Sequence, residues 1–535
     1  MKVIIAEKPS VAQQIAAVVG ATTRREGYIE GGGYAVTWAF GHLVGPAMPE
    51  AYGIEGFKRE NLPILPETFV LEPRRVKSGK EYKPDPGAVK QLAVLKELFS
   101  RTERIVVATD AGREGELIFR FIYHYLDCKT PFDRLWISSL TERAIREGLA
   151  NIRPGSEYDD LYLSARARCE ADWIVGINAS QALAIAAGRG AWSLGRVQTP
   201  TLALVCGRYL ENTSFTPQTY FRLKLHTAKD ATAFAVLSTP KYDTKAAADE
   251  ACTAVRGSDG VQVTKVERRN VTEQPPLLYD LTALQKEANT RHGFSAEKTL
   301  GIAQELYEKK LITYPRTDSR FLTEDMAASL PGLVTDTGRA FAVEEPFPIH
   351  VQQVINGSKV TDHHALLPTK SMANADLAAL PAGERNILRL IATRLLCAVG
   401  EPHRYAETTI ITICAGEEFS AKGKVVLSEG WKAVERKMLG ELLGKQKEPA
   451  VLPDVKEQSQ CSIAGAELKE GQTSPPKHFT EDLLLHAMET ASADSMPEGV
   501  ERQGIGTPAT RAATIEKLVQ KGFLERKGTK KTKVL

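Results

Sequence analysis

Hydrophobic and polar positions in the first 150 or so residues alternate in the rhythm of a parallel sheet with crossover helices. The apolar runs 3–6 and 105–108 are continuous and rich in β-branched residues, and polar turns follow them, so both are predicted to be buried strands. Glu7 follows the first run, and Asp110 and Glu114 follow the second. Because ligands bind at the carboxyl ends of strands in open α/β sheets, we expect these acids to converge at one edge.

The pattern changes after residue 215. Alternation at 215–275 and again at 405–475 predicts antiparallel strands with one solvent-exposed face. Residues 278–404 have mostly helical periodicity, which suggests a helical domain inserted into a β domain. Within this insertion a short apolar strand is expected just before Tyr314, with Arg316 on the same strand face as the tyrosine.

One internal repeat is visible. Residues 295–312 and 507–524 align without gaps, and each predicts a capping Ser or Thr, a helix, a basic turn and a short apolar strand. Winged-helix elements have this pattern and commonly bind DNA. A generic helix–turn–strand unit fits equally well, so the repeat alone leaves both interpretations open.

Composition is that of a soluble globular protein. The chain has 535 residues, 43% hydrophobic and 25% charged, and its length suggests about three or four domains. The net charge is +3, so any site for a polyanion must be a local cluster. No signal peptide and no membrane span of roughly 18 apolar residues is visible, so we expect a cytoplasmic protein.

Two kinds of chemistry are disfavoured by what the sequence lacks. Its seven cysteines are scattered without a CxxC pair, which argues against a zinc ribbon and against a disulfide framework. No GxxxxGK[ST] loop occurs, which argues against ATP chemistry of the P-loop kind.

The first candidate cluster for chemistry is a set of charged residues at strand ends: Glu7, Lys8, Asp110, Glu114 and Glu116. Clustered carboxylates repel one another and favour a cation, and ligation by oxygen alone suits Mg²⁺. Solvated acids in turns are the alternative interpretation.

The second cluster is the segment SLGRVQTP at 193–200, together with the helical stretch before it. Its arginines supply positive charge, and its hydroxyl and amide groups can bind phosphate or sugar oxygens. The residues concerned are Arg166, Arg168, Arg196, Ser180, Ser193, Gln198 and Thr199. A solvated helix face would also account for the arginines.

The third cluster combines TYPRTDS with TDHHALLPT. Attack of the Tyr314 hydroxyl on a phosphate needs a cation such as Arg316, and His363 can assist phosphate binding or proton transfer. An enzyme that breaks and reseals a phosphodiester without ATP must store the bond energy covalently, as a phosphotyrosine does. Taken singly, the tyrosine and the histidines are also compatible with packing roles.

Six segments in this order, EKPS, TDAGREGE, SLGRVQTP, ITYPRTDS, HHALLPT and GIGTPATR, resemble the type IA DNA topoisomerases over nearly the whole chain, and the AEKPS opening resembles the topoisomerase III branch. The resemblance implies a multidomain α/β and α+β fold whose four domains form a toroid. It divides the chain into a Toprim domain (1–153), a split DNA-binding domain of winged-helix type (154–215 and 476–535), a β-rich arch (216–277 and 405–475) and a helical domain with the nucleophilic tyrosine (278–404).

The resemblance also implies roles for single residues. Tyr314 would attack single-stranded DNA and become linked to the 5′ end, with Arg316 stabilising charge at the phosphate and His363 assisting cleavage. Glu7 would act near the leaving 3′ oxygen, and Lys8 would contact the scissile phosphate. The DNA contacts would come from Arg168, Asp172, Ser180, Ser193, Leu194, Gly195, Arg196, Val197 and Gln198.

The acidic motif departs from the family's DxDxE pattern because Gly112 stands at its middle acid. We therefore expect one Mg²⁺ site at Glu7 and Asp110, with Glu114 as the third ligand and Glu116 as a substitute, and neither zinc nor ATP.

The substrates implied are single-stranded and negatively supercoiled DNA, which would be relaxed and decatenated by a monomer that is nucleoid-associated if bacterial, with a helicase or single-strand-binding protein as a candidate partner. Two rivals remain: a Toprim nuclease or primase that uses the acids alone, and a nucleic-acid-binding module that has lost catalysis.

Overall fold

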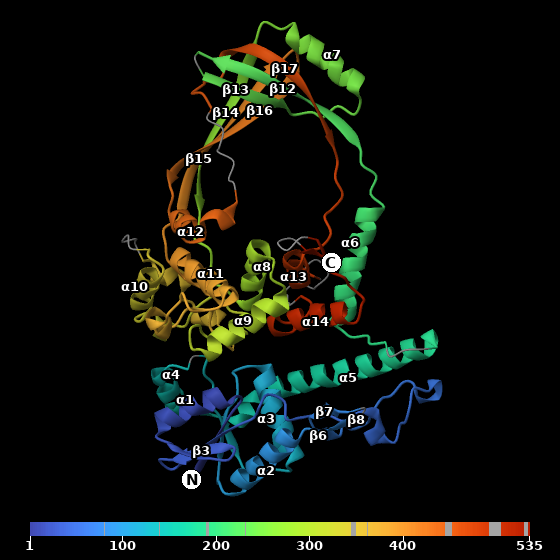
Figure 1. Cartoon of the computed structure of the whole chain (residues 1–535), viewed down its shortest axis with the longest axis vertical. Coiled ribbons are helices and arrows are strands. Elements are labelled where there is room, and N and C mark those ends of the chain that lie inside the picture. Colours follow the sequence, from blue (N-terminus) through green and yellow to red (C-terminus); the bar gives the residue numbers. More distant parts are fainter. Residues whose placement is uncertain are drawn as a thin grey trace.

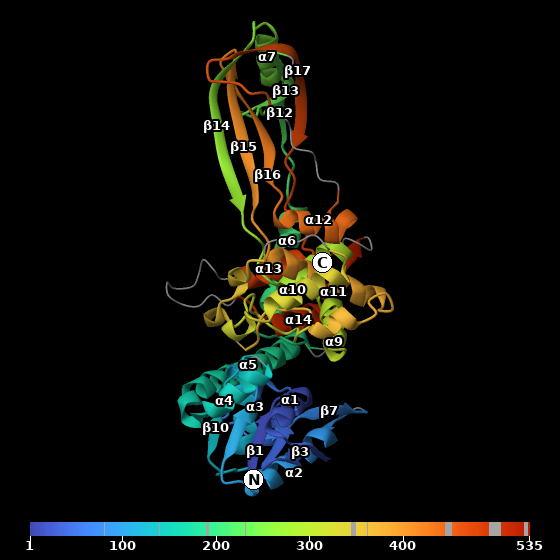
Figure 2. The same ribbon diagram turned by 90° about the vertical axis from the view of Figure 1, so that its left-hand side faces the viewer.

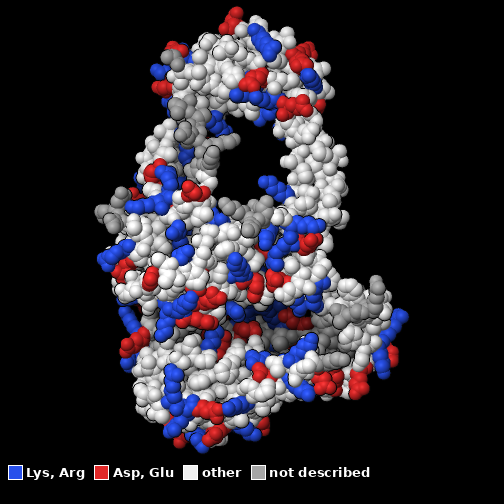
Figure 3. All heavy atoms as spheres, viewed as in Figure 1, with Lys and Arg blue, Asp and Glu red and all other residues white. Residues whose placement is uncertain are grey.

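The structure, a computed structural model, describes residues 1–79, 81–138, 140–188, 192–230, 232–343, 349–360, 362–444, 452–491, 504–528 and 533–535. A β-barrel at one end is joined by two separate connections to a layer of helices, and an α/β domain lies beneath that layer (Figures 1 and 2). Figure 3 shows the hole that the barrel, the two connections and the helices enclose. The predicted multidomain toroid is confirmed. Among the helices described, none is long and apolar enough to cross a membrane.

The N-terminal domain is built on a seven-stranded sheet of order β11-β10-β9-β1-β4-β3-β2. Both predicted buried strands are confirmed, and they are parallel neighbours in which Val3 pairs with Ile105. The strands are β1 (Lys2–Ala6), β2 (Thr23–Arg25), β3 (Tyr28–Gly31), β4 (Tyr34–Trp38), β9 (Ile105–Ala108), β10 (Phe132–Arg134) and β11 (Arg153–Pro154). The helices are α1 (Pro9–Val19), α2 (Pro86–Ser100), α3 (Arg113–Tyr125) and α4 (Glu142–Ala150), and two small ribbons pair β5 (Val44–Pro46) with β6 (Leu71–Pro73) and β7 (Arg75–Ser78) with β8 (Glu81–Pro84).

The long helix α5 (Asp159–Ala187) lies along the top of the N-terminal domain (Figure 1). Tyr162 and Ala165 enter the core of that domain, and Trp173 Nε1 donates a hydrogen bond to the Ala47 carbonyl at 2.9 Å. After α5 the chain rises to α6 (Gln198–Thr213), which shares a core with the C-terminal elements. These elements are α13 (Glu481–Thr490), α14 (Pro508–Gln520), β18 (Lys527–Gly528) and β19 (Lys533–Val534).

The barrel is closed by strands in the order β12-β13-β16-β15-β14-β17. All its strand pairs are antiparallel, as the alternating pattern predicts. Its elements are β12 (Thr219–Lys229), β13 (Thr232–Ser238), α7 (Lys245–Arg256), β14 (Val261–Glu273), β15 (His403–Cys414), β16 (Glu417–Ser428) and β17 (Gln460–Gln472).

The helical domain is inserted between β14 and β15, which confirms the predicted arrangement. Glu273 at the end of β14 pairs with His403 at the start of β15, so the chain enters and leaves the insertion side by side. The helices are α8 (Leu281–His292), α9 (Ala296–Glu308), α10 (Leu330–Ala340) and α11 (Ala382–Ala398). Helix α12 (Trp431–Leu439) follows β16 and adds Met438 and Leu439 to the same core.

The strand predicted before Tyr314 is wrong. Ile312 forms only an isolated bridge with Pro368, and the Thr313 amide donates to the Leu367 carbonyl at 2.9 Å. Two causes are visible: Lys310 turns the chain out of α9 with a φ of 60°, and Pro315 has no amide proton for a ladder. Tyr314 therefore lies in an irregular loop.

The internal repeat is confirmed as two capped helices. The Ser295 hydroxyl accepts from the Lys298 amide at the start of α9, and Thr507 forms a capping box with Thr510 at the start of α14. At the other ends, Lys310 and its repeat equivalent Gly522 both have positive φ. The short strands predicted at 311–312 and 523–524 are wrong, because each helix ends in a turn instead.

Candidate active site

The candidate active site lies where the N-terminal domain meets the helical domain, an interface that we call the gate. Glu7 and Lys8 follow β1, and Asp110 follows its neighbour β9, so the sheet brings the three together as predicted. Lys8 Nζ donates to Asp110 Oδ2 at 2.6 Å and lies 3.3 Å from Glu7 Oε1. The Asp110 amide in turn donates to Glu7 Oε2 at 3.3 Å.

Tyr314 and His363 approach this cluster from the helical domain. His363 Nε2 lies 3.1 Å from Asp110 Oδ2, and the centroids of the Tyr314 and His363 rings are 4.6 Å apart. Lys8 Nζ lies 4.2 Å from the centroid of the Tyr314 ring. Tyr307 of α9 packs edge-on against Tyr314 at a centroid distance of 5.4 Å. The tyrosine is therefore held between a cation, an imidazole and a second phenol.

Burial and charge set the protonation of these groups. Burial raises the pKa of Tyr314, and Lys8 opposes that shift. Burial and the nearby Asp110 raise the pKa of Glu7 above its ordinary value. Although burial acts in the other direction, the hydrogen bond with His363 and the charge of Lys8 hold the pKa of Asp110 well below its usual range. Between the two acids, Glu7 is thus the one that keeps a proton more readily.

Neither of the other two predicted metal ligands joins Glu7 and Asp110. Glu114 Oε1 lies 2.6 Å from His42 Nε2, and this hydrogen bond lowers the pKa of the glutamate. Glu116 is fully buried, and its carboxylate accepts from Arg120 Nε at 2.8 Å and Arg134 Nε at 3.0 Å. Its suggested role as a substitute ligand is therefore wrong.

No group of three or more His, Cys, Asp or Glu side chains suited to a metal ion is found among the residues that the structure describes. A pair of carboxylates remains, because Glu7 and Asp110 are both within reach of the Lys8 ammonium. The two acids already hold one cation, the Lys8 ammonium. Their carboxylate oxygens therefore have the negative charge and the ligand chemistry that Mg²⁺ needs.

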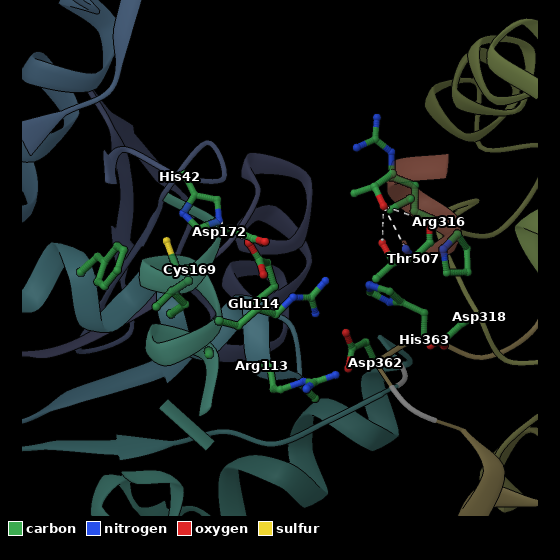
Figure 4. A pocket seen from close by; sticks show the side chains of 18 of the residues that line it. His42, Arg113, Glu114, Cys169, Asp172, Arg316, Asp318, Asp362, His363 and Thr507 are labelled. Atoms are coloured by element: carbon green, nitrogen blue, oxygen red, sulfur yellow. Dashed lines mark hydrogen bonds and ion pairs between the residues drawn. The ribbon is translucent and has the colours of Figure 1, made fainter. Parts of the chain in front are cut away.

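A cavity of about 1070 Å³, which we call the groove, runs from the gate along α5. In Figure 4, Asp362 and His363 face Arg113 and Glu114 from the opposite side, and Arg316 lies farther away, beside Thr507. Five arginines are among the residues that line the groove: Arg74, Arg113, Arg168, Arg196 and Arg316. Figure 3 shows basic and acidic side chains along the same cleft. Burial and the positive charges of Arg196 and Arg113 lower the pKa of Arg168. A bound polyanion would reduce this repulsion between the arginines.

The SLGRVQTP segment lies at one end of the groove. Ser180 Oγ of α5 accepts from the Leu194 amide at 2.9 Å, which fixes the segment on the helix. Arg196 Nη2 donates to Asp172 Oδ2 at 2.9 Å. A second cavity of about 260 Å³ next to it is lined by Ser193, Leu194, Gly195, Arg196, Val197 and Gln198, with Asp172 and part of α14. Eight of the nine residues predicted to contact DNA line these two adjoining cavities, and the ninth, Ser180, is bonded to Leu194 of the lining.

Sequence reasoning missed several residues that line the groove. Arg113 stands inside the quoted TDAGREGE motif, yet only its acids received roles. Arg511, which ends the GIGTPATR motif, does not line the groove; it is buried and donates to the carbonyls of Ile505 and Gly506 at 3.1 Å each, which fixes the turn before α14. Asp362 was quoted only as the residue before His363. Arg74 had no signal in the sequence, because it reaches the groove from a short ribbon.

Comparisons with known proteins point the same way. A family model described as DNA topoisomerase matches residues 156–534, and one described as Toprim domain matches residues 2–140. DNA topoisomerase 3 of Bacillus subtilis (strain 168) is 40% identical over 98% of this chain and 73% of its own length. DNA topoisomerase 3 of Shouchella clausii (strain KSM-K16) is 37% identical with the same coverage. The structure of full-length topoisomerase I from Thermotoga maritima matches with a TM-score of 0.67 at 25% identity, covering 99% of this chain and 80% of that one.

Proposed function

Since this chain belongs to the type IA DNA topoisomerases, we propose that it cuts one DNA strand with Tyr314, passes another strand through the gap and reseals the cut without ATP. The observation that supports this best is the position of Tyr314. Its ring lies at the gate, 4.2 Å from Lys8 Nζ and 4.6 Å from the His363 ring. A tyrosine that served only for packing would not need a cation and an imidazole at its ring.

In the reaction, the Tyr314 oxygen attacks the phosphorus of a single-stranded phosphodiester and the bond to the 3′ oxygen breaks. The phenol gives up its proton, the 3′ oxygen gains one, and the 5′ phosphate remains on the tyrosine. Resealing reverses these steps, so the energy of the broken bond is kept in the phosphotyrosine.

Negative charge develops on the phosphate during the attack, and three side chains can offset it. The Lys8 ammonium is fixed by two acids beside the phenol, Arg316 is exposed at the lining of the groove, and His363 is held by Asp110. Prepositioned charges of this kind stabilise a transition state because they need no reorganisation during the reaction. Glu7, with its raised pKa, is placed to give a proton to the 3′ oxygen.

Glu7 and Asp110 would hold Mg²⁺. When bound, Mg²⁺ supplies positive charge at the scissile phosphate. Glu7 cannot hold a proton and a metal ion at once, so its two roles belong to different stages of the cycle.

The groove and its arginines support a path for single-stranded DNA along α5, with phosphate contacts from Arg168 and Arg196. Strand passage would require the helical domain to swing away from the N-terminal domain about the paired junction of Glu273 and His403. We propose that a monomer suffices, because one chain encloses the hole, and that a helicase or single-strand-binding protein supplies its single-stranded substrate.

The experiment uses oligonucleotides labelled at the 3′ or 5′ end, mixed with the protein and Mg²⁺ and stopped with detergent. A covalent adduct that carries the 3′ label, and that Tyr314→Phe abolishes while single-strand binding persists, is the expected result. Tyr307→Phe, which changes a neighbouring phenol in the same way, is the matched control and should still form the adduct.

Two outcomes would point elsewhere. Free cleavage products from both the wild type and Tyr314→Phe would indicate a nuclease that uses the acids alone. Binding without any cleavage would indicate a nucleic-acid-binding module.

A further inference from the structure

The ribbon of β7 and β8 projects from the side of the N-terminal domain (Figure 2). Arg74, which lines the groove, immediately precedes β7, and its carbonyl accepts from the Asp85 amide at 2.7 Å. The Asp85 carboxylate also caps α2 by accepting from the Gly87 amide at 2.9 Å. The ribbon therefore begins at the edge of the groove, on a base that α2 holds in place.

Packing does not explain the ribbon. Each of the four residues in either strand is exposed, so neither face of the ribbon covers a core. A two-stranded ribbon of this kind is only marginally stable in water. It nevertheless presents large apolar groups to solvent, because Val76 is 38% exposed and Tyr82 is 60% exposed. An exposed aromatic ring on a projecting ribbon is typical of a binding surface.

The strand pairing divides the side chains of the ribbon between two faces. Lys77 pairs with Tyr82, and Arg75 pairs with Pro84. Paired residues share a face in an antiparallel ribbon, whereas neighbours along a strand point to opposite faces. One face, which we call the basic face, therefore carries Arg75, Lys77, Tyr82 and Pro84. The other face carries Val76, Ser78, Glu81 and Lys83.

The two faces differ in charge. On the second face, Lys83 Nζ lies 3.4 Å from Glu81 Oε2, so the charge of this lysine is compensated. On the basic face, Lys77 makes no ion pair with any residue in the described part of the chain. Its ammonium is therefore available to a ligand, directly across the ribbon from the exposed Tyr82 ring.

Arg75 adds a second cation to the basic face. Its Nη2 donates to the Tyr82 carbonyl at 2.8 Å, and its Nη1 lies 3.8 Å from Glu72 Oε1. Such a long contact at the surface compensates the arginine only weakly. The basic face thus combines two cations with an exposed phenol ring.

We propose that the basic face binds single-stranded DNA beyond the groove, with a base stacked on Tyr82 and a phosphate at Lys77. The inference rests on the proposed path of DNA along α5, which the ribbon would extend past Arg74. Cations that follow the backbone and aromatic rings that stack on bases are how proteins bind single strands without regard to sequence. The ribbon would therefore lengthen the bound strand without acting in the cleavage step.

The test measures binding by fluorescence anisotropy with labelled single-stranded oligonucleotides of increasing length. All proteins are full-length and carry Tyr314→Phe, so that no covalent adduct forms. Lys77→Ala combined with Tyr82→Ala should bind the shortest strands like the parent protein. It should bind long strands about tenfold more weakly, because one stacked base and one phosphate contact are lost. Melting curves establish that each variant is folded.

Three single variants separate the basic face from the ribbon as a whole. Lys83→Ala removes the same charge from the opposite face and should bind strands of every length like the parent. Tyr82→Phe keeps the ring and should do the same. With long strands, Lys77→Ala should reduce the slope of log affinity against log salt concentration by about 0.7, the value for one phosphate contact on a single strand.

Equal affinities of the double variant and the parent for long strands would overturn the inference. A loss in Lys83→Ala as large as that in Lys77→Ala would also overturn it, because the effect would then not depend on the face. Arg168→Ala, a change within the groove, should weaken the binding of short and long strands alike. Unchanged binding by that variant would instead overturn the proposed path along α5, and with it the claim that the ribbon extends this path. The two failures are therefore distinguishable.

Discussion

Among single residues, Lys8 carries the charge balance of the candidate active site. Its ammonium bonds Asp110, lies 3.3 Å from Glu7 and stands 4.2 Å from the centre of the Tyr314 ring. These two acids raise the pKa of Lys8 although burial opposes the shift, so the ammonium stays charged at any working pH. Without it, two buried carboxylates would face the nucleophile and repel the approaching phosphate.

Lys8→Met should therefore slow formation of the covalent adduct by about 10²–10³-fold, the usual cost of losing one prepositioned charge. The measurement is single-turnover cleavage of a 3′-labelled oligonucleotide. Lys2→Met, an exposed lysine at the start of the same strand, is the matched control and should cleave at the wild-type rate. Equal rates for the two variants would show that Lys8 does not act on the reaction.

Helix α3 illustrates how one element divides its acids between two tasks. Glu114 and Glu116 are two residues apart and therefore point to different sides of the helix. Glu114 faces the groove, whereas Glu116 is fully buried between Arg120 and Arg134. Glu116 compensates the charge of the fully buried Arg134, whereas Arg120 also pairs with Asp159 at 2.7 Å.

Glu116→Gln should destabilise the N-terminal domain by about 3–5 kcal/mol, because it removes the counter-charge that the fully buried Arg134 pairs with. Glu114→Gln, on the same helix but exposed to the groove, should change stability by less than about 1 kcal/mol. Urea unfolding of both full-length variants, followed by circular dichroism, measures the difference. Similar midpoints would mean that Glu116 is not needed to neutralise Arg134.

The same elements show how far sequence could lead. Continuous apolar runs identified β1 and β9, and strand adjacency then placed Glu7 beside Asp110. Local pattern could not reveal that Arg134 pairs with Glu116 or that Asp362 covers Gly112, because the first contact joins two different elements, β10 and α3, and the second joins segments far apart in the chain. The strand expected before Tyr314 failed for a related reason: its apolar residues are buried by the helical core rather than by a sheet.

For the whole molecule, the decisive feature is that the site is divided between two domains. The charged residues Glu7, Lys8 and Asp110 follow β1 and β9. The proposed nucleophile Tyr314 belongs instead to an insertion that is attached to the barrel through β14 and β15. A further gate contact lies away from the site, where Thr141 Oγ1 donates to Asp325 Oδ2 at 3.3 Å. Opening the gate for a passing strand must separate this pair, whereas cutting a strand already in the groove need not.

Linking that pair should therefore separate cleavage from strand passage. Thr141→Cys and Asp325→Cys can be joined by a short thiol-reactive crosslinker that contains a reducible disulfide. The crosslinked protein should still form the adduct with an oligonucleotide but should fail to relax negatively supercoiled plasmid. Reduction should restore relaxation. Each single-cysteine variant, treated identically, controls for the exposed native Cys206. Full relaxation by the crosslinked protein would show that strands pass elsewhere, because a gate closed by a covalent bond cannot admit one.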